Sequence, residues 1–271
     1  MVDVLTWQGK LAAALAAVEK AKRRDPRNST DYRVRQGIVY TQLGQFQEGI
    51  AALKSYLDRY PHSLWAHAYL ATDYFNLGEQ DAARTETARV RWLAALTPNS
   101  AIRYQVLAFM LSDQRRPTEG LAAAERGEAL DPVNSLILFQ LGAQHDNLGH
   151  WAESVAALKR YAAPYPDEER EGCLCDTWLH ALLAEDYAAL GQVDDAEAEA
   201  VQVERIFERE PNSAIGYWPL VVALNAQGKE AEALRALEKA LRLDPGNRVN
   251  YVYAQGHVLT NLGRWKKRFL L

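Results

Sequence analysis

Cys173, Cys175 and His180 are the residues whose types and spacing most resemble a metal site, because thiols and imidazoles are zinc ligands. A structural zinc site needs four ligands, and the sequence offers no second pair at a suitable spacing. Two cysteines so close together also cannot form a disulfide framework. We therefore expect no metal site and no structural disulfide.

Catalytic motifs are absent from the sequence. It contains no glycine-rich phosphate loop, no His-Glu-x-x-His zinc motif and no nucleophile elbow. An enzyme hypothesis would need a strongly shifted acid or base near Glu185, Asp146 or His257, and no set of partner residues accompanies any of them. The histidines are scattered, and core or surface roles are expected for them. We predict a non-enzymatic protein with no catalytic residue and no cofactor.

Composition and charge narrow the function further. The 271 residues include 31 Lys+Arg against 35 Asp+Glu, a formal charge of −4, and 48% are hydrophobic. Slight acidity disfavours nucleic-acid binding, and the basic run at 264–268 is short enough to be solvated helix surface. The apolar runs are too short to cross a bilayer, and the N-terminus has no signal-peptide pattern. A cytoplasmic protein that does not insert into membranes is the expectation.

An internal repeat dominates the sequence. Seven prolines end similar phrases at spacings of 34 to 45 residues, namely Pro26, Pro61, Pro98, Pro132, Pro166, Pro211 and Pro245. Glycines alternate with them at Gly9, Gly44, Gly78, Gly149, Gly191, Gly228 and Gly263. Arg115 occupies the corresponding slot between Gly78 and Gly149. Alanine-rich segments with 3.6-residue periodicity separate these residues, which predicts helices rather than strands.

The glycines and prolines have a physical role as helix terminators. Glycine after a helix adopts the left-handed conformation that caps its last carbonyls, and proline shortly after a helix blocks its continuation. Asn-Ser pairs that follow three of the prolines, at 99–100, 134–135 and 212–213, can cap the next helix. The predicted unit is helix, glycine turn, helix, proline turn.

We call the position of these glycines, including Arg115, the glycine slot. Two further columns of residues lie at fixed distances from it. Small residues lie seven positions before it, at Gly37, Ala71, Ala108, Gly142, Ala184 and Gly256, with Val221 as the exception. Small residues also lie five positions after it, at Ala14, Gly49, Ala83, Gly120, Ser154, Ala196 and Ala233. Small side chains in these columns allow the two helices of each unit to approach closely.

This pattern resembles the tetratricopeptide repeat family, whose phrase is large-x2-Leu-small-x2-Tyr, then alanine, then proline. His67-x2-Leu70-Ala71-x2-Tyr74 is one match. The tryptophan typical of the family's first helix is replaced, in chain order, by Arg33, His67, Tyr104, Leu138, His180 and Tyr217. The resemblance implies an all-α, right-handed superhelical solenoid of antiparallel helix hairpins.

The repeat pattern also predicts the domain organisation. Residues 1–28 form a partial N-terminal repeat, 29–166 form four repeats, 177–245 form two repeats and 246–271 form a partial C-terminal repeat. The 45-residue spacing from Pro166 to Pro211 places a linker or insertion at 167–176. Complete polar-faced capping helices are missing at both ends, so we expect a piece of a longer array, whose ends could self-associate.

In the family, first helices line a concave groove through positions 13, 10, 6, 3 and 2 residues before the glycine slot. The resemblance therefore assigns a peptide-binding groove to Trp65, Phe75, Asn76, Ile102, Phe109, Leu136, Phe139, Asn147, Trp178, Trp218, Asn225 and Tyr253. Aromatic residues of this kind dominate the binding energy of many protein interfaces. The predicted function is a scaffold that binds an apolar peptide or protein segment.

Alternatives remain open at this point. The groove residues could instead pack against neighbouring helices, or a terminal segment of the chain could fill the groove. The groove columns contain no lysine, which argues against the carboxylate clamp of the family's chaperone-tail binders. The main alternative function is a ligand- or peptide-sensing region of a larger bacterial signalling or regulatory protein.

Overall fold

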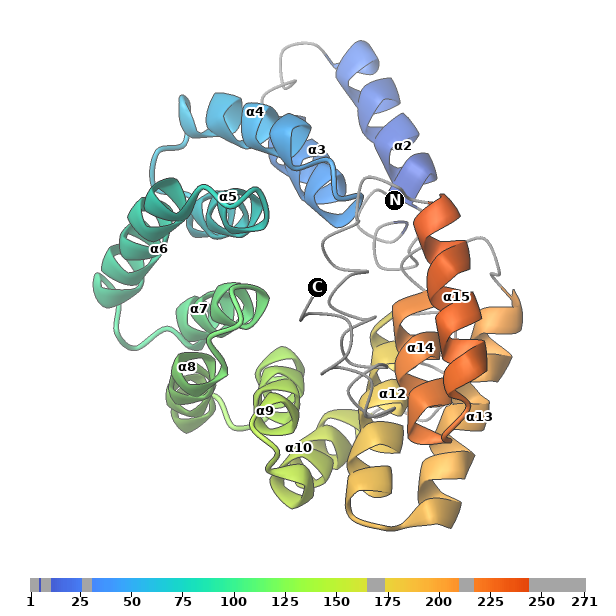
Figure 1. The fold of residues 1–271 in the computed structure, drawn as a ribbon. Helices are drawn as coiled ribbons and strands as arrows, with labels where there is room; N and C mark the ends of the chain where they lie inside the picture. Colours follow the sequence, from blue (N-terminus) through green and yellow to red (C-terminus); the bar gives the residue numbers. More distant parts are fainter. Residues whose placement is uncertain (1–4, 6–10, 26–30, 165–173, 210–216, 244–271) are drawn as a thin grey trace, which may run out of the picture. The chain divides into compact units, whose positions relative to one another are not determined.

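The computed structural model describes residues 5, 11–25, 31–164, 174–209 and 217–243, and these residues contain helices and no strand. They fall into two compact units, with the division between Pro164 and Tyr165. Each unit is built from antiparallel helix hairpins, as the repeat predicts (Figure 1). The predicted all-α solenoid of helix hairpins is confirmed.

Unit 1 contains one helix followed by four hairpins. The helix is α2 (Leu11–Arg24), and the hairpins are α3 (Asp31–Gln42) with α4 (Phe46–Leu57), α5 (Leu64–Asn76) with α6 (Gln80–Ala95), α7 (Ala101–Asp113) with α8 (Pro117–Leu130), and α9 (Ser135–Asn147) with α10 (Trp151–Ala162). Successive first helices pack on one another, α3 on α5, α5 on α7 and α7 on α9. They lie on the inside of the curve that unit 1 follows, while the second helices lie outside (Figure 1).

The described residues of unit 2 form two hairpins. They are α12 (Leu174–Ala189) with α13 (Val193–Arg209), and α14 (Tyr217–Ala226) with α15 (Glu230–Leu243). The first helices α12 and α14 pack on each other, as they do in unit 1. Most of the predicted insertion at 167–176 and all of the predicted partial repeat at 246–271 lie outside the described residues.

The glycine slot works as predicted. The five described glycines of this column have φ between 70° and 77°, and Arg115 takes the same left-handed conformation with φ 57°. At each turn the residue after the slot donates its backbone N–H to a carbonyl five positions earlier, as in Gln45 to Tyr40 at 2.9 Å. This is the Schellman arrangement that satisfies the last carbonyls of a helix.

The predicted N-caps are only partly observed. Asn134 caps α9 because its Oδ1 accepts the Ile137 N–H at 3.3 Å. Ser100 occupies the N-cap of α7 but makes no capping hydrogen bond through its side chain. Ser63, which was not predicted, caps α5 by accepting the Ala66 N–H at 3.4 Å. The Asn212-Ser213 pair lies outside the described residues.

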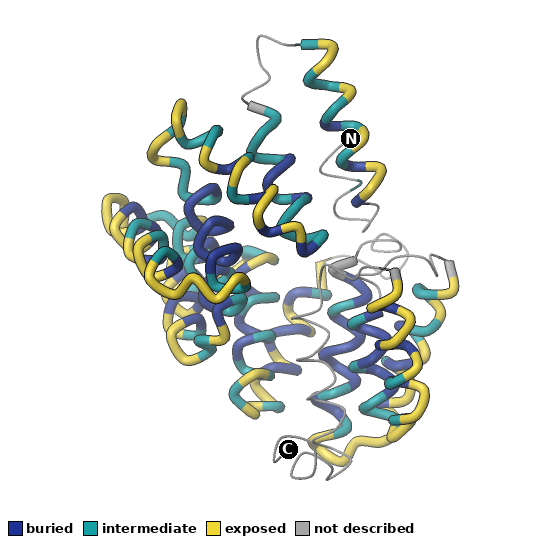
Figure 2. The backbone as a smooth tube through the Cα atoms, turned by 45° about the horizontal axis from the view of Figure 1, so that its top comes forward, coloured by how far each residue is buried: buried dark blue, intermediate teal, exposed yellow. Residues whose placement is uncertain are grey.

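The small-residue column sets the distance between the helices of a hairpin. A Cβ added at Gly37 would lie 2.5 Å from Leu53 Cγ, and one at Gly142 would lie 2.6 Å from the Leu158 side chain. Both leucines are completely buried. Buried residues therefore run as stripes along the helices, with exposed residues on the opposite sides (Figure 2). Because one face of each first helix packs against the second helix of its hairpin, its other faces are available to form a site.

Candidate functional site

An aromatic cluster joins the first helices of unit 1. The Trp65 ring lies 5.9 Å from Tyr69 and 5.7 Å from Phe109, and Tyr69 lies 5.4 Å from Phe109 between ring centroids. Val34 and Ile38 on α3 pack against the same cluster. The helices α3, α5 and α7 therefore share one apolar cluster, in which Val34, Ile38, Trp65 and Phe109 are half-buried and Tyr69 is buried.

Five predicted groove residues of unit 1 fall into two classes. Trp65, Phe75 and Phe109 belong to or pack against the aromatic cluster and are half-buried. Ile102 and Leu136 lie in the first turns of α7 and α9 and are 59% and 46% exposed. The half-buried residues belong to one packed cluster, whereas the two aliphatic residues present about half of their surface to solvent.

The other predicted groove residues have varied surroundings. Phe139 places its ring edge-on against Tyr161 of α10, at 5.4 Å between centroids. Asn76 is half-buried, whereas Asn147 is exposed and donates its amide to the Ala143 carbonyl of its own helix at 2.6 Å. These side chains are not joined to the aromatic cluster by any ring contact or hydrogen bond found among the described residues.

Unit 2 has its own aromatic pair. Trp178 on α12 and Trp218 on α14 lie 6.2 Å apart between ring centroids, and both are half-buried. Trp218 also packs against the core of unit 2. Asn225 is half-buried on α14, and Tyr253 lies outside the described residues.

Two carboxyl groups adjoin the aromatic cluster of unit 1. The Thr72 hydroxyl donates to Asp113 Oδ2 at 3.3 Å, which links α5 to α7. Burial raises the pKa of Asp113 to about 7, although the Thr72 hydrogen bond acts in the opposite direction. Burial and the nearby Asp113 raise the pKa of Asp73 to about 8. Burial and the same two carboxyl groups raise the pKa of Tyr69, which places all three groups near one another.

Asp73 illustrates a polar position that sequence reasoning missed. It is completely buried five residues before the glycine slot, and a Cβ at Gly49 of the preceding repeat would lie 2.6 Å from its Oδ2. Gln144 occupies the same slot two repeats later, also completely buried, and Gly120 would be equally close to its Oε1 at 2.7 Å. The sequence contains a signal for both contacts. In each case a polar residue lies five positions before the glycine slot, and the small-residue column of the preceding repeat has glycine.

Two buried histidines form a second feature that the sequence did not identify. His67 Nδ1 lies 2.6 Å from Glu86 Oε2, and its Nε2 lies 3.0 Å from the Pro61 carbonyl oxygen. Both partners can only accept hydrogen bonds when Glu86 is ionised, so the geometry favours the doubly protonated imidazolium. Burial by itself lowers the pKa of His67, but the Glu86 and Pro61 hydrogen bonds raise it above the ordinary value.

The second histidine, His180, occupies the equivalent position of unit 2. Its Nδ1 lies 2.5 Å from Glu199 Oε2 and its Nε2 lies 3.5 Å from Asp176 Oδ1. Burial by itself lowers the pKa of His180, whereas the two carboxylates raise it to about 9. The sequence did contain a signal for these pairs, because Glu86 and Glu199 both lie eight residues after the glycine slot, where every other repeat except the last, with Leu271, carries alanine.

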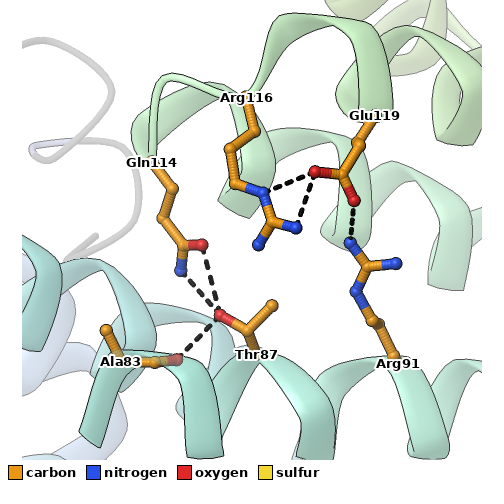
Figure 3. Close-up of polar contacts among 6 residues, drawn as sticks. All are labelled: Ala83, Thr87, Arg91, Gln114, Arg116 and Glu119. Atoms are coloured by element: carbon orange, nitrogen blue, oxygen red, sulfur yellow. Dashed lines mark hydrogen bonds and ion pairs between the residues drawn. The ribbon is translucent and has the colours of Figure 1, made fainter. Parts of the chain in front are cut away.

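The second helices meet the next repeat through polar contacts. Thr87 on α6 donates to the Ala83 carbonyl at 2.8 Å and accepts from Gln114 Nε2 at 2.9 Å (Figure 3). Nearby, Glu119 accepts from both Arg91 and Arg116. Both arginine–glutamate pairs are solvent-exposed, and exposed pairs of this kind contribute less than about 1 kcal/mol. We assign them a structural role between the second and third repeats.

The outer surface also has a shallow depression. It is lined by His67, Thr85, Glu86, Ala88, Arg89 and Trp92. The Arg89 guanidinium lies 4.7 Å from the Trp92 ring centroid, and these two side chains fill part of the depression. Among the described residues no group of three histidine, cysteine, aspartate or glutamate side chains could hold a metal ion. Within the same residues, no helix is sufficiently long and apolar to cross a bilayer.

Family models agree with the repeat pattern. Models of the tetratricopeptide repeat match residues 31–63 and residues 182–248, one in each unit. A curated relative is the BBSome complex member bbs-4 of Caenorhabditis elegans, 22% identical over 162 residues. That match includes 60% of this chain and 34% of the relative, so the chain spans about a third of that protein's length.

Solved structures share the fold. The chain is similar to a structure described as the APC/C hetero-tetramer Cut9-Hcn1, with TM-score 0.59 and 15% identity over 95% of this chain and 48% of that one. It is also similar to a tetratricopeptide repeat protein from Parabacteroides merdae, with TM-score 0.53 and 16% identity over 92% and 95% of the two chains. Together with the left-handed glycine turns and the hairpin packing, the two family-model matches show that the chain contains tetratricopeptide repeats at residues 31–63 and 182–248.

Proposed function

We propose that this protein is a non-catalytic interaction scaffold that binds a peptide or protein segment along the inner faces of its first helices. In unit 1 the segment contacts Trp65, Phe75, Phe109, Ile102 and Leu136. In unit 2, Trp178 and Trp218 provide a corresponding apolar surface. The twelve groove residues assigned from the family resemblance remain the working description of this surface.

One observation carries the proposal, namely the half-buried aromatic surface on α5 and α7, which Val34 and Ile38 of α3 adjoin. Its side chains are held in place by mutual contacts, yet Trp65, Phe75 and Phe109 are only partly covered. Rigid aromatic side chains that are already ordered lose little conformational entropy when they bind a partner. The exposed Ile102 and Leu136 extend the apolar surface to α7 and α9.

The relatives support an interaction role in general terms. The curated relative is a member of a complex, and the Cut9-Hcn1 structure is itself a hetero-tetramer. Neither name describes an enzymatic activity. Binding to other proteins is therefore the property we transfer to this chain, without the identity of either partner.

The test is a selection of displayed 12-residue peptides against the full chain, followed by affinity measurements on two double variants. Ile102→Ser/Leu136→Ser removes exposed apolar side chains from the first helices. The matched control, Leu96→Ser/Leu130→Ser, removes similarly exposed leucines from the ends of the second helices. All four side chains are at least 36% exposed, so neither variant should unfold the protein.

The proposal predicts that the inner-face variant weakens binding about tenfold or more and that the control does not, since buried apolar anchors typically contribute 1 to 2 kcal/mol or more. Circular dichroism verifies that both variants fold. Equal binding by both variants, or weaker binding only by the control, would place the binding surface elsewhere and reject the proposal.

A further inference from the structure

The charged residues in the inner-face columns are all acidic. Positions 13, 10, 6, 3 and 2 residues before the glycine slot contain no lysine or arginine in any repeat, although the chain has 31 such residues. The charged residues found there are all carboxylates, namely Asp3, Asp31, Asp113, Asp146 and Glu185. An apolar surface that carries only negative charges complements a basic partner rather than an acidic one.

Asp113 is the carboxylate of these columns that is hydrogen-bonded to α5, the helix that carries Trp65 and Tyr69. It is half-buried at the C-terminal end of α7, where it accepts the Thr72 hydroxyl at 3.3 Å. The neighbouring Asp73 is completely buried. Both carboxyl groups influence Tyr69, whose ring contacts Trp65 and Phe109. A half-buried side chain that carries a carboxyl group therefore lies beside the aromatic cluster.

We propose that the segment bound to unit 1 carries a lysine or arginine whose charged end pairs with Asp113 while its stem and neighbouring apolar residues cover Trp65 and Phe109. This inference rests on the proposed function and specifies its partner as a basic, apolar segment. The cation would be attracted both by the carboxylate and by the negative faces of the aromatic rings.

Other ligands fit this surface less well. An acidic or C-terminal carboxylate group would meet Asp113 with no lysine or arginine in the inner-face columns to receive it. A wholly apolar segment would cover the half-buried Asp113, which would then have to remain charged without a new partner or take up a proton, and both cost free energy above its pKa of about 7. A basic side chain removes both difficulties, because it supplies the opposite charge where the carboxyl group has lost part of its hydration.

The experiment uses the same display selection on the full chain. We expect the selected 12-residue peptides to contain a lysine or arginine beside apolar residues. The strongest peptide is then synthesised with acetylated and amidated ends, together with a version in which the basic residue is glutamine. Titration calorimetry measures both peptides against the wild type, Asp113→Asn and the control Glu125→Gln, which removes one exposed negative charge from a second helix, α8.

The expected result is a loss of about tenfold to a hundredfold in affinity for the basic peptide in Asp113→Asn, the range for one hydrogen bond to a charged group. Glu125→Gln should retain the affinity at 150 mM salt, and the glutamine peptide should bind wild type and Asp113→Asn equally. Asp113→Glu, which retains the charge, should restore part of the affinity and guards against a merely structural effect.

The outcomes separate this inference from the proposed function. Selected peptides without basic residues, whose binding depends on Ile102 and Leu136 but not on Asp113, would reject the inference and leave the proposed function intact. Basic peptides that bind Glu125→Gln as weakly as Asp113→Asn would also reject it, because the effect would then be general charge. If no peptide is selected, or if binding ignores all inner-face substitutions, both proposals are rejected.

Discussion

The two units place a histidine in the same slot, eleven residues before the glycine, but surround it differently. In unit 1, His67 faces one carboxylate, Glu86, and one backbone carbonyl, from Pro61. In unit 2, His180 lies between two carboxylates, Glu199 and Asp176. A raised pKa is common to both histidines, and the pKa of His180 reaches about 9.

The difference originates four residues before the histidine. Unit 1 has Ser63 at this position, where its hydroxyl caps α5, whereas unit 2 has Asp176 within the first turn of α12. Asp176 is 2% exposed, so its charge is compensated inside the protein rather than by water. The comparison teaches that a family position usually filled by tryptophan can hold a buried ion pair, provided that the second helix supplies glutamate.

The largest effect is expected when His180 is removed. His180→Ala leaves Asp176 and Glu199 near each other without the cation, and breaking a buried pair in this way costs about 3 kcal/mol or more. His67→Ala leaves only Glu86, whose side chain is 20% exposed, and should cost about 1 to 2 kcal/mol. Hydrogen exchange followed by mass spectrometry measures the two units separately, in α12 and α13 against α5 and α6.

A matched control for this prediction is His150→Ala, because His150 is exposed and should contribute little. Two double variants extend the test, because each replaces both members of a histidine–glutamate pair. They are His180→Leu/Glu199→Leu and His67→Trp/Glu86→Ala. Equal losses of protection in His67→Ala and His180→Ala would contradict the assigned role of Asp176.

The pH dependence of stability should also distinguish His180 from His67, and this effect is expected to be the next largest. His180 has its pKa raised to about 9 in the folded state, so its contribution is complete below about pH 6.5 and is lost as the pH rises through 9. The loss of stability for α12 and α13 should reach about 3 to 4 kcal/mol, at about 1.4 kcal/mol per pKa unit. His67 should act in the same direction with a smaller effect.

NMR titration of the two imidazoles measures these pKa values directly, and hydrogen exchange corrected for its intrinsic pH dependence measures the stability. Asp176→Asn serves as the internal comparison, because it should move the titration of His180 towards that of His67. If His180 titrates near the ordinary histidine pKa, the assignment of a charged imidazole that contacts both Asp176 and Glu199 is wrong.

Unit 1 should have a pH response of its own through Asp73. Its folded-state pKa of about 8 lies above the ordinary 3.8, so the stability associated with its neutral form is present below about pH 4 and is lost as the pH rises through 8. Asp73→Asn should therefore stabilise α3 to α5 by a few kcal/mol at pH 9, where the buried charge is removed, since a shift of roughly four pKa units at about 1.4 kcal/mol each sets the upper limit. Little change is expected at pH 4.

Urea unfolding of the wild type and Asp73→Asn at both pH values measures this effect, with Glu125→Gln as the control for net charge. Gln144, which fills the same slot with a neutral amide, indicates that the position accepts an uncharged side chain of this chemistry. A variant that is less stable than wild type at pH 9 would show that the Asp73 carboxylate has an ionic partner.

The architecture was predictable from sequence because its determinants are local and repeated. Gly44, Gly78 and their counterparts mark left-handed turns, and Gly37 and Gly142 mark close helix contacts. Each signal is weak alone, but a solenoid repeats it, so the columns reinforce one another. Capping was less predictable, since Ser100 occupies an N-cap without using its hydroxyl.

The candidate site was less predictable because it depends on contacts between repeats. The alignment placed Trp65 and Phe109 on the inner face, yet it could not show that their rings touch across two helices. Asp113 carries no sequence pattern of its own, and the raised pKa values of both carboxyl groups follow from burial, to which the nearby Asp113 adds in the case of Asp73. The His67–Glu86 pair was accessible in principle, because both residues depart from the repeat together.

The smallest effect concerns the turns, where the units also differ. Both described turns of this type in unit 2 have glycine, Gly191 and Gly228, while unit 1 has Arg115 at φ 57° between α7 and α8. A non-glycine residue in this conformation costs about 1 kcal/mol, because its Cβ approaches the following carbonyl. Arg115→Gly should therefore stabilise unit 1 by up to about 1 kcal/mol, less the entropy that glycine adds to the unfolded chain.

Urea unfolding measures this gain, and Gly78→Arg at the equivalent turn before α6 provides the reverse substitution, in a place where nothing lies within 4 Å of an added Cβ. If backbone strain alone governs the slot, the two substitutions should have opposite signs and similar size. A loss of stability in Arg115→Gly would mean that the arginine side chain contributes more through its contacts than the left-handed backbone costs.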